Sequence, residues 1–297
     1  MVDICACDVN DNAKLALFIQ KREEWARCII GSAPHTVNRQ ITHMLWNDTV
    51  FRTFNEARRL TIEGNSKKYG FNAPLTRLLD EGFVASQTMR IRRLTDRNFR
   101  EPEKAVISLV RVIDDIKENL HLVTRENYMC HEGIPYAEPD SMQDRVAWMH
   151  WRTKQTNFDK LSGTAESKRE RSDKMQQSVL QRLSKELKIC DSVRKYVNKF
   201  IAHASDPETN PALKEEEKKI TLDKLDDCYR AIVRVGSFLG AVFLYEYSLG
   251  NVPTPQYDQL KNIERSMVAK PDVEKLHTFW NGRCREVENW DKNLWDE

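Results

Sequence analysis

The sequence predicts an all-α protein, and three observations carry this prediction. Apolar residues recur at helical spacings of three and four along most of the 297 residues. A convincing alternation with a period of two, the mark of a half-buried strand, is hard to find. The longest notable apolar run, from Val235 to Tyr245, has 11 residues, whereas a membrane span needs about 20. This run therefore predicts a buried core helix.

Two helices are expected before residue 66. The first runs from Asn12 to about Ile30, because its apolar residues fall on one face among Lys, Arg and Glu. These apolar residues are Leu15, Ile19, Trp25 and Ile29. The second helix follows Pro34 and ends before Gly64 and Asn65.

The middle of the chain alternates helices with a long loop. Pro74 suits the first turn of a helix over residues 75–94, and Pro102 is expected to open an antiparallel neighbour of that helix. Residues 127–140 contain Gly and Pro at turn positions and predict a loop, after which Ser141 is expected to cap the next helix.

A long helix is expected from near Thr221 to Gly250, where glycine would provide a left-handed cap. The predicted organisation has N-terminal helices packed on the core over residues 1–74 and a helical core over residues 75–250. A C-terminal helical extension of the same domain follows over residues 251–297.

Composition and charge narrow the class of function. Lys and Arg number 47 against 45 Asp and Glu, a net charge of only +2, so any binding of a polyanion must use a local patch. The seven cysteines lack metal-ligand spacing, and neither a metal site nor a cofactor is expected. Asp3 and Asp8 stand where a signal peptide has a basic start and an apolar run. We expect a cytoplasmic protein that does not enter a membrane.

The most informative segment is VRKYVNKFIAHAS, around His203. On a helix, Tyr196, Lys199, Phe200 and His203 share one face. The ammonium of Lys199 would lower the pKa of His203 below its ordinary value of about 6.5 and favour the neutral imidazole, which accepts protons. A general base and a packed or capping histidine both fit this arrangement.

This segment resembles the signature of the HEPN superfamily (higher eukaryotes and prokaryotes nucleotide-binding), in its bacterial abortive-infection branch. Three further segments are similar to that branch: IRRLTDR at 91–97, NYMCHEGIPY at 127–136 and FDKLSG at 158–163. The resemblance implies an antiparallel helical bundle of HEPN type, with extra N- and C-terminal helices, that forms a homodimer. It also implies a cleft in which many members cut RNA without metal, and it carries over Asn198, Lys199 and His203 as candidate catalytic residues.

The signature departs from the family at one position. Val197 stands where the arginine of the motif belongs, immediately before Asn198. Arg194 precedes His203 by nine residues, which on a regular helix puts it on the opposite side. Lys199 is better placed, but an ammonium lacks the bidentate fork of a guanidinium. Arg194 and Tyr196 are kept as candidate substrate-binding residues.

An arginine-rich helix supplies further candidates. The stretch TMRIRRLTDRNFR suits a phosphate backbone, and in the family this helix lies near the cleft. Arg92, Arg93 and Asp96 are therefore secondary substrate-binding candidates. The structural interpretation is that these arginines pair with Asp96 and Glu101 or cover the bundle with their stems.

Two other groups have a structural and a chemical interpretation. Cys130 and His131 are adjacent but have no partners at metal-ligand spacing. The second group is a set of aromatic and methionine side chains on one predicted helix, Met142, Trp148, Met149 and Trp151. Such a set is more typical of a core or an interface than of a base-stacking platform.

The leading functional hypothesis is a HEPN-like dimer that binds RNA or a nucleotide. It would be a weak or inactive metal-independent endoribonuclease in phage defence, or in a toxin–antitoxin pair with an antitoxin as partner. The alternative is a non-catalytic helical interaction module. DNA binding through Arg92 and Arg93 is a third hypothesis.

Overall fold

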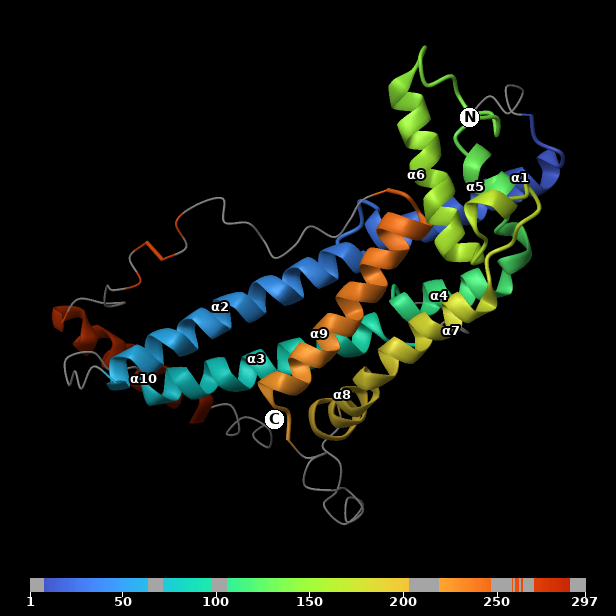
Figure 1. The fold of residues 1–297 in the computed structure, drawn as a ribbon. Coiled ribbons are helices and arrows are strands. Elements are labelled where there is room, and N and C mark those ends of the chain that lie inside the picture. The colour runs from blue at the N-terminus through green and yellow to red at the C-terminus, as the bar shows by residue number, and fades with distance from the viewer. Residues whose placement is uncertain are drawn as a thin grey trace. The chain divides into compact units, whose positions relative to one another are not determined.

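The structure is a computed structural model, and it describes residues 8–63, 72–97, 106–202, 219–246, 258, 260–261, 263 and 270–288. Within these residues the regular structure is helical and no strand occurs, which confirms the all-α prediction (Figure 1). The α-helices are α1 (Asn12–Ile30), α2 (Val37–Glu63), α3 (Ala73–Leu94), α4 (Leu109–Glu118), α5 (Arg125–Cys130), α6 (Arg145–Ser162), α7 (Gln177–Glu186), α8 (Asp191–Tyr196), α9 (Leu222–Ser237) and α10 (Val273–Glu288). Short 3₁₀ or π turns are η3 (Leu120–Leu122), η4 (Glu166–Lys168), η5 (Leu187–Cys190), η6 (Val197–Ile201), η9 (Phe238–Phe243) and η10 (Lys270–Asp272).

The chain divides into two compact units, Met1–Pro253 and Thr254–Glu297. The first unit holds α1 to α9, and the second holds α10. Among the helices described, none combines the length and the apolar character needed to cross a membrane.

The helices of the first unit pack in two connected groups. The long helices α2 and α3 lie side by side, and α9 packs on both of them (Figure 1). The second group comprises α1, α5, α6 and the π turn η9, which closes the end of α9. One apolar core runs through both groups, with Trp25, Ile91 and Val235 among its fully buried members.

The N-terminal helices begin where the sequence predicts. Asp11 caps α1 by accepting a hydrogen bond from the Lys14 amide at 2.9 Å. Asn72 caps α3 in the same way with the Leu75 amide at 3.0 Å, and Pro74 occupies the first turn as expected.

The helix expected to open at Pro102 begins later. Pro102 lies outside the described residues, and residues 106–108 are not helical. Ser108 caps α4: its Oγ accepts from the Arg111 amide at 3.1 Å and donates to the carbonyl oxygen of Asp96 at 2.6 Å. The main packing partners of α4 are α7, α1 and α9, so the expected pairing with α3 is not its principal contact.

The loop predicted at 127–140 is also shorter than expected. Residues 127–130 belong to α5, which begins after Thr124 as its cap and is buried along its whole length. Asp144, rather than Ser141, caps α6 by accepting from the Ala147 amide at 2.9 Å.

The last helix of the first unit starts near Thr221, as predicted, but ends early. Thr221 accepts from the Lys224 amide at 3.2 Å, as a cap does. The helix then widens into η9 and ends at Phe243, and Gly250 lies outside the described residues. Tyr245 takes the left-handed conformation instead, with φ of 53°. Its position is held from both sides: Arg22 donates to the carbonyl oxygen of Leu244 at 2.6 Å, and the Tyr245 ring packs edge-on against His150.

Candidate functional site

The segment that leads to His203 packs on the core through one face. Cys190, Val193 and Val197 are fully buried at helical spacing. This face contacts α3 and, through η5, α9. The side chains between these positions therefore point away from the core, and they are the ones available to a ligand.

The last described turn of this segment is π-helical rather than α-helical. The amide of Ala202 donates to the carbonyl oxygen of Val197 at 2.8 Å, five residues back. The expectation of one regular helix from Arg194 to His203 is therefore wrong, because a π turn is wider than an α turn. Such turns are frequent at functional sites. His203 itself lies outside the described residues.

The candidate residues of this turn differ in their surroundings. Asn198 is exposed, while Lys199 and Tyr196 are partly exposed. The rings of Tyr196 and Phe200 lie 5.1 Å apart, as expected for neighbours on one helical face. Arg194 forms an ion pair with Asp191 at 3.0 Å. The turn thus presents an amide and cationic groups beside an aromatic pair.

Val197, where the resemblance leads us to expect an arginine, has no exposed surface. A valine here contributes to the core and cannot contact a ligand in this conformation. The charged group that would offset a developing phosphate charge is therefore missing from this position.

The secondary candidates lie at the end of α3. Arg92 is partly exposed and Arg93 is exposed, and both fall in the last turn of the helix. Asp96 follows the helix, and its carbonyl oxygen is bound by Ser108 at the start of α4. Burial and then the charge of Arg93 lower the pKa of Arg90. The structure packs α3 against α8 and η6, so it brings the two candidate elements together.

The pair Cys130 and His131 has a structural environment. Cys130 is fully buried, and His131 Nδ1 donates to the carbonyl oxygen of Tyr128 at 2.8 Å. Burial, and then the charges of Lys154 and Arg22, lower the pKa of His131 to about 3. Among the residues that the structure describes, no group of His, Cys, Asp and Glu could hold a metal ion.

Next to His131 lies a buried lysine that sequence reasoning missed. Lys154 is 1% exposed, pairs with Glu132 at 2.9 Å and donates to the carbonyl oxygen of Met129 at 3.1 Å. Burial lowers the pKa of Lys154 despite the carboxylate of Glu132. His150 Nε2 lies 3.3 Å from the same carboxylate, at the edge of a cavity of about 240 Å³. Met129 and Lys154 are 25 residues apart, so no local pattern indicated the cluster.

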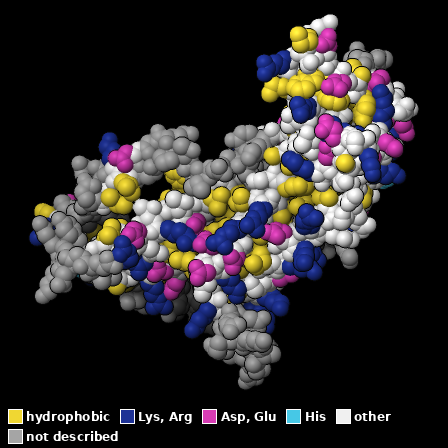
Figure 2. Space-filling model, in the orientation of Figure 1, with side chains coloured by type: hydrophobic (Ala, Val, Ile, Leu, Met, Phe, Trp, Pro, Cys, Tyr) yellow, Lys and Arg dark blue, Asp and Glu magenta, His cyan; other side chains and the backbone are white. Residues whose placement is uncertain are grey.

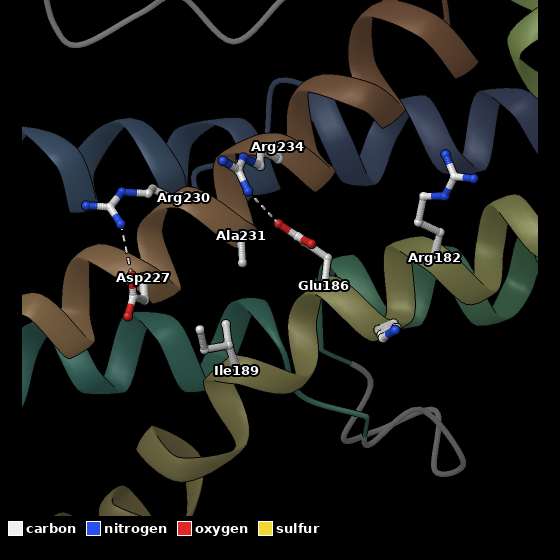
Figure 3. A pocket seen from close by; sticks show the side chains of 8 residues that line it. Arg182, Glu186, Ile189, Asp227, Arg230, Ala231 and Arg234 are labelled. Atoms are coloured by element: carbon white, nitrogen blue, oxygen red, sulfur yellow. Dashed lines mark hydrogen bonds and ion pairs between the residues drawn. The ribbon is translucent and has the colours of Figure 1, made fainter.

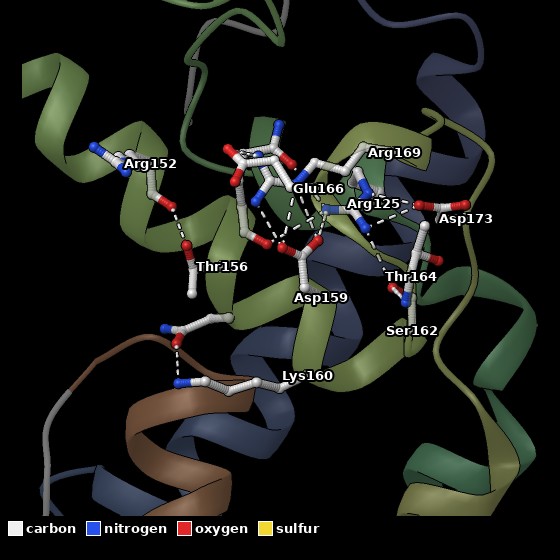
Figure 4. A network of polar contacts seen from close by, with 12 residues as sticks. Arg125, Arg152, Thr156, Asp159, Lys160, Ser162, Thr164, Glu166, Arg169 and Asp173 are labelled. Carbon is white, nitrogen blue, oxygen red and sulfur yellow. Dashed lines mark hydrogen bonds and ion pairs between the residues drawn. The ribbon is translucent and has the colours of Figure 1, made fainter.

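A buried arginine also holds the end of α6 to the chain around it (Figure 4). Arg125 is fully buried and pairs with Asp159 and Asp173, each at 2.9 Å. Arg169 shares Asp159 at 2.6 Å. Burial alone would raise the pKa of Asp159, but hydrogen bonds from Arg169 and Arg125 lower it. Every charge here has a partner inside the protein, which indicates a structural network.

The helical fold and the segment before His203 together define the class: an all-helical protein of the HEPN type. A family model described as AbiU2, a HEPN-type family associated with abortive infection, matches residues 40–262, about three quarters of the chain. The chain belongs to this AbiU2 family of HEPN proteins. No curated protein and no solved structure matches the chain significantly.

Proposed function

We propose that this protein is a homodimer that binds RNA through the segment of residues 194–203 and cleaves it weakly or not at all. Membership of a HEPN family supports a nucleotide-related or abortive-infection role. The exposed amide of Asn198 and the neighbouring cations Arg194 and Lys199 suit contacts to phosphate and sugar. The toxin–antitoxin setting and an antitoxin partner belong to the same proposal.

The burial of Val197 is the observation that carries the second half of the proposal. Attack by a ribose 2′-hydroxyl needs a proton acceptor, which a neutral His203 supplies. It also needs a cation at the phosphate, and preorganised charge of this kind commonly contributes a factor of about 10² to 10³ in rate. With a buried valine at the arginine's position, binding is retained while the rate falls.

Cleavage is tested with purified protein and labelled single-stranded RNA in the presence of a chelator. The proposal predicts RNA that stays intact at catalytic protein concentrations and slow cleavage, with cyclic phosphate ends, only at high concentrations. His203→Ala should abolish this residual cleavage, whereas His121→Ala, an exposed histidine in η3, should not. Rapid metal-free turnover by the wild-type protein would contradict the proposal.

A second candidate, a non-catalytic interaction module, is favoured by one observation. Met142, Val146 and Met149 are 92%, 79% and 55% exposed near the start of α6, so they are not part of the core. Figure 2 shows apolar side chains gathered at this end of the molecule. This candidate predicts that RNA leaves the melting temperature unchanged, while Val146→Glu with Met149→Glu shifts the sedimentation coefficient from dimer to monomer.

A further inference from the structure

A groove runs between α7 and α9. Its lining residues do not include any of residues 194–203. Its volume is about 510 Å³. Figure 3 shows its lining, and Figure 2 shows Lys and Arg side chains gathered over these two helices. The lining residues are Arg182, Lys185, Glu186, Ile189, Asp227, Arg230, Ala231 and Arg234.

The lining carries more positive than negative charge. Four of its residues are cationic and two are carboxylates, so this one groove has the net charge of +2 that the whole chain has. Arg182 and Lys185 are exposed and have no ion-pair partner among the described residues. Within the described part of the chain, these two cations of α7 are therefore not matched by carboxylates.

The two carboxylates are already paired with the two cations of α9. Arg230 pairs with Asp227 at 2.9 Å along the helix, and Arg234 pairs with Glu186 at 3.0 Å across the groove (Figure 3). Solvent reaches both partners of the pair across the groove, since 70% of the Arg234 side chain and 39% of the Glu186 side chain are exposed. Exposed ion pairs contribute little to stability. An arriving anion can therefore take over Arg230 and Arg234 at little cost.

The shape of the groove suits an extended chain of phosphates. Ile189 and Ala231 are its only apolar lining residues, and η5 packs closely on α9 beneath them. From Asp227 to Arg234 the helix rises about 10 Å at about 1.5 Å per residue. This length exceeds the distance between successive phosphates of one strand, so the groove can contact more than one phosphate.

We propose that this groove binds the phosphate backbone of RNA, as a second contact separate from the segment of residues 194–203. The choice of RNA as the ligand rests on the function proposed above, whereas the site itself does not use the residues of that segment. The groove gives affinity without reading the sequence, because its contacts are ionic. The segment would then act on a strand that the groove holds.

The test measures the binding of fluorescently labelled oligouridine by anisotropy between about 50 and 200 mM salt. The variant Arg182→Ala with Lys185→Ala should bind at least about tenfold more weakly at the lower salt concentration. The slope of log affinity against log salt should fall by about 1.4, since each lost contact to single-stranded RNA contributes about 0.7. Glu186→Gln should bind more tightly, because it releases Arg234.

The matched control is Arg59→Ala with Arg77→Ala, which removes the same charge at exposed positions on α2 and α3. It should change affinity far less than the groove variant. Equal losses of RNA affinity in both double variants, or wild-type affinity in the groove variant, would contradict RNA binding in the groove. A groove variant that loses the binding of ATP but keeps the binding of RNA would also contradict the proposal.

The two proposals fail in different ways. If His203→Ala and Asn198→Ala leave RNA binding and cleavage unchanged, the segment is not the site, and the groove still stands when its own variant weakens binding. If only the segment's variants weaken binding, the groove is wrong and the proposed function stands.

Discussion

The carbonyl oxygen of Val197 accepts a hydrogen bond from the amide of Ala202 at 2.8 Å, so a π turn immediately precedes His203 in the sequence. This bond fixes the backbone of the turn, while the Val197 side chain is anchored in the core. Asn198, the next residue, is exposed. Val197 is therefore buried and the adjacent Asn198 is exposed, so the same substitution at these two positions should affect stability differently.

Val197→Arg should destabilise the protein rather than restore a nuclease. A guanidinium at this fully buried position would lie in the apolar core, and an unpaired buried charge costs at least about 3 kcal/mol. Asn198→Arg is the matched control, because an exposed substitution changes stability by about 0.5 kcal/mol or less. Chemical denaturation measures both. A Val197→Arg protein of wild-type stability that cleaves RNA would show that the position opens to solvent.

Stability should fall as the pH drops below about 6.5, the ordinary pKa of histidine in the unfolded chain. Burial lowers the folded pKa of His131 to about 3, so between these values the unfolded chain binds the extra proton. Unfolding is thereby favoured as the pH falls, with a slope of up to about 1.4 kcal/mol per pH unit for one proton. Carboxylates titrate mainly below pH about 5, so the window from about 5 to 6.5 isolates the histidine.

His131→Asn should flatten this slope, since an amide can replace the hydrogen bond to Tyr128 but does not titrate. His121→Asn, at an exposed position, should leave the slope as it is in the wild type. Denaturation curves at several pH values give the answer. Equal slopes in the wild-type and His131→Asn proteins would refute the assignment of a neutral, buried His131.

Arg125→Met should cost about 3 to 5 kcal/mol of stability, because it leaves Asp159 and Asp173 without their buried partner. Arg152→Ala is the comparison: Arg152 is exposed and stacks on Trp148, and its loss should cost about 1 kcal/mol or less. Melting temperatures of the two variants should differ clearly. Similar values would mean that solvent reaches the Arg125 network.

Buried and exposed cysteines should differ in the reactivity of their thiols. Cys190 and Cys228 are fully buried, and the hydrogen bond between their thiols together with burial raises the pKa of Cys190. A thiol with a raised pKa forms little of the reactive thiolate. Alkylation followed by mass spectrometry should therefore label the exposed Cys284 before these two, which should react only on unfolding. Early labelling of Cys190 would contradict the packing of η5 on α9.

The sequence predicted those parts of the fold that depend on local patterns. Helical periodicity, together with Pro74 for α3, was enough to place α1, the start of α3 and the start of α9 near Thr221. It failed where a tertiary contact decided the outcome. Ser108 starts α4 because it also bonds Asp96, and η9 ends early because α1 and α6 pack on it.

The candidate site was predicted only as a stretch of sequence. The motif around Asn198 and Lys199 could be recognised, but a π turn depends on packing that periodicity does not encode. The burial of Val197 likewise follows from the contact of its helix with α3. The groove was missed because Arg182 and Arg230 are far apart in the sequence and meet only when α7 packs beside α9.

The most direct test of the account is to locate bound RNA on the wild-type protein. Oligonucleotides with 4-thiouridine are crosslinked by ultraviolet light without metal, and the modified peptides are identified by mass spectrometry. We predict crosslinks in the peptide that spans Tyr196 to His203, with Asn198→Ala reducing their yield. A protein that yields no crosslinks, or crosslinks confined to peptides outside residues 194–203, would contradict RNA binding at this segment.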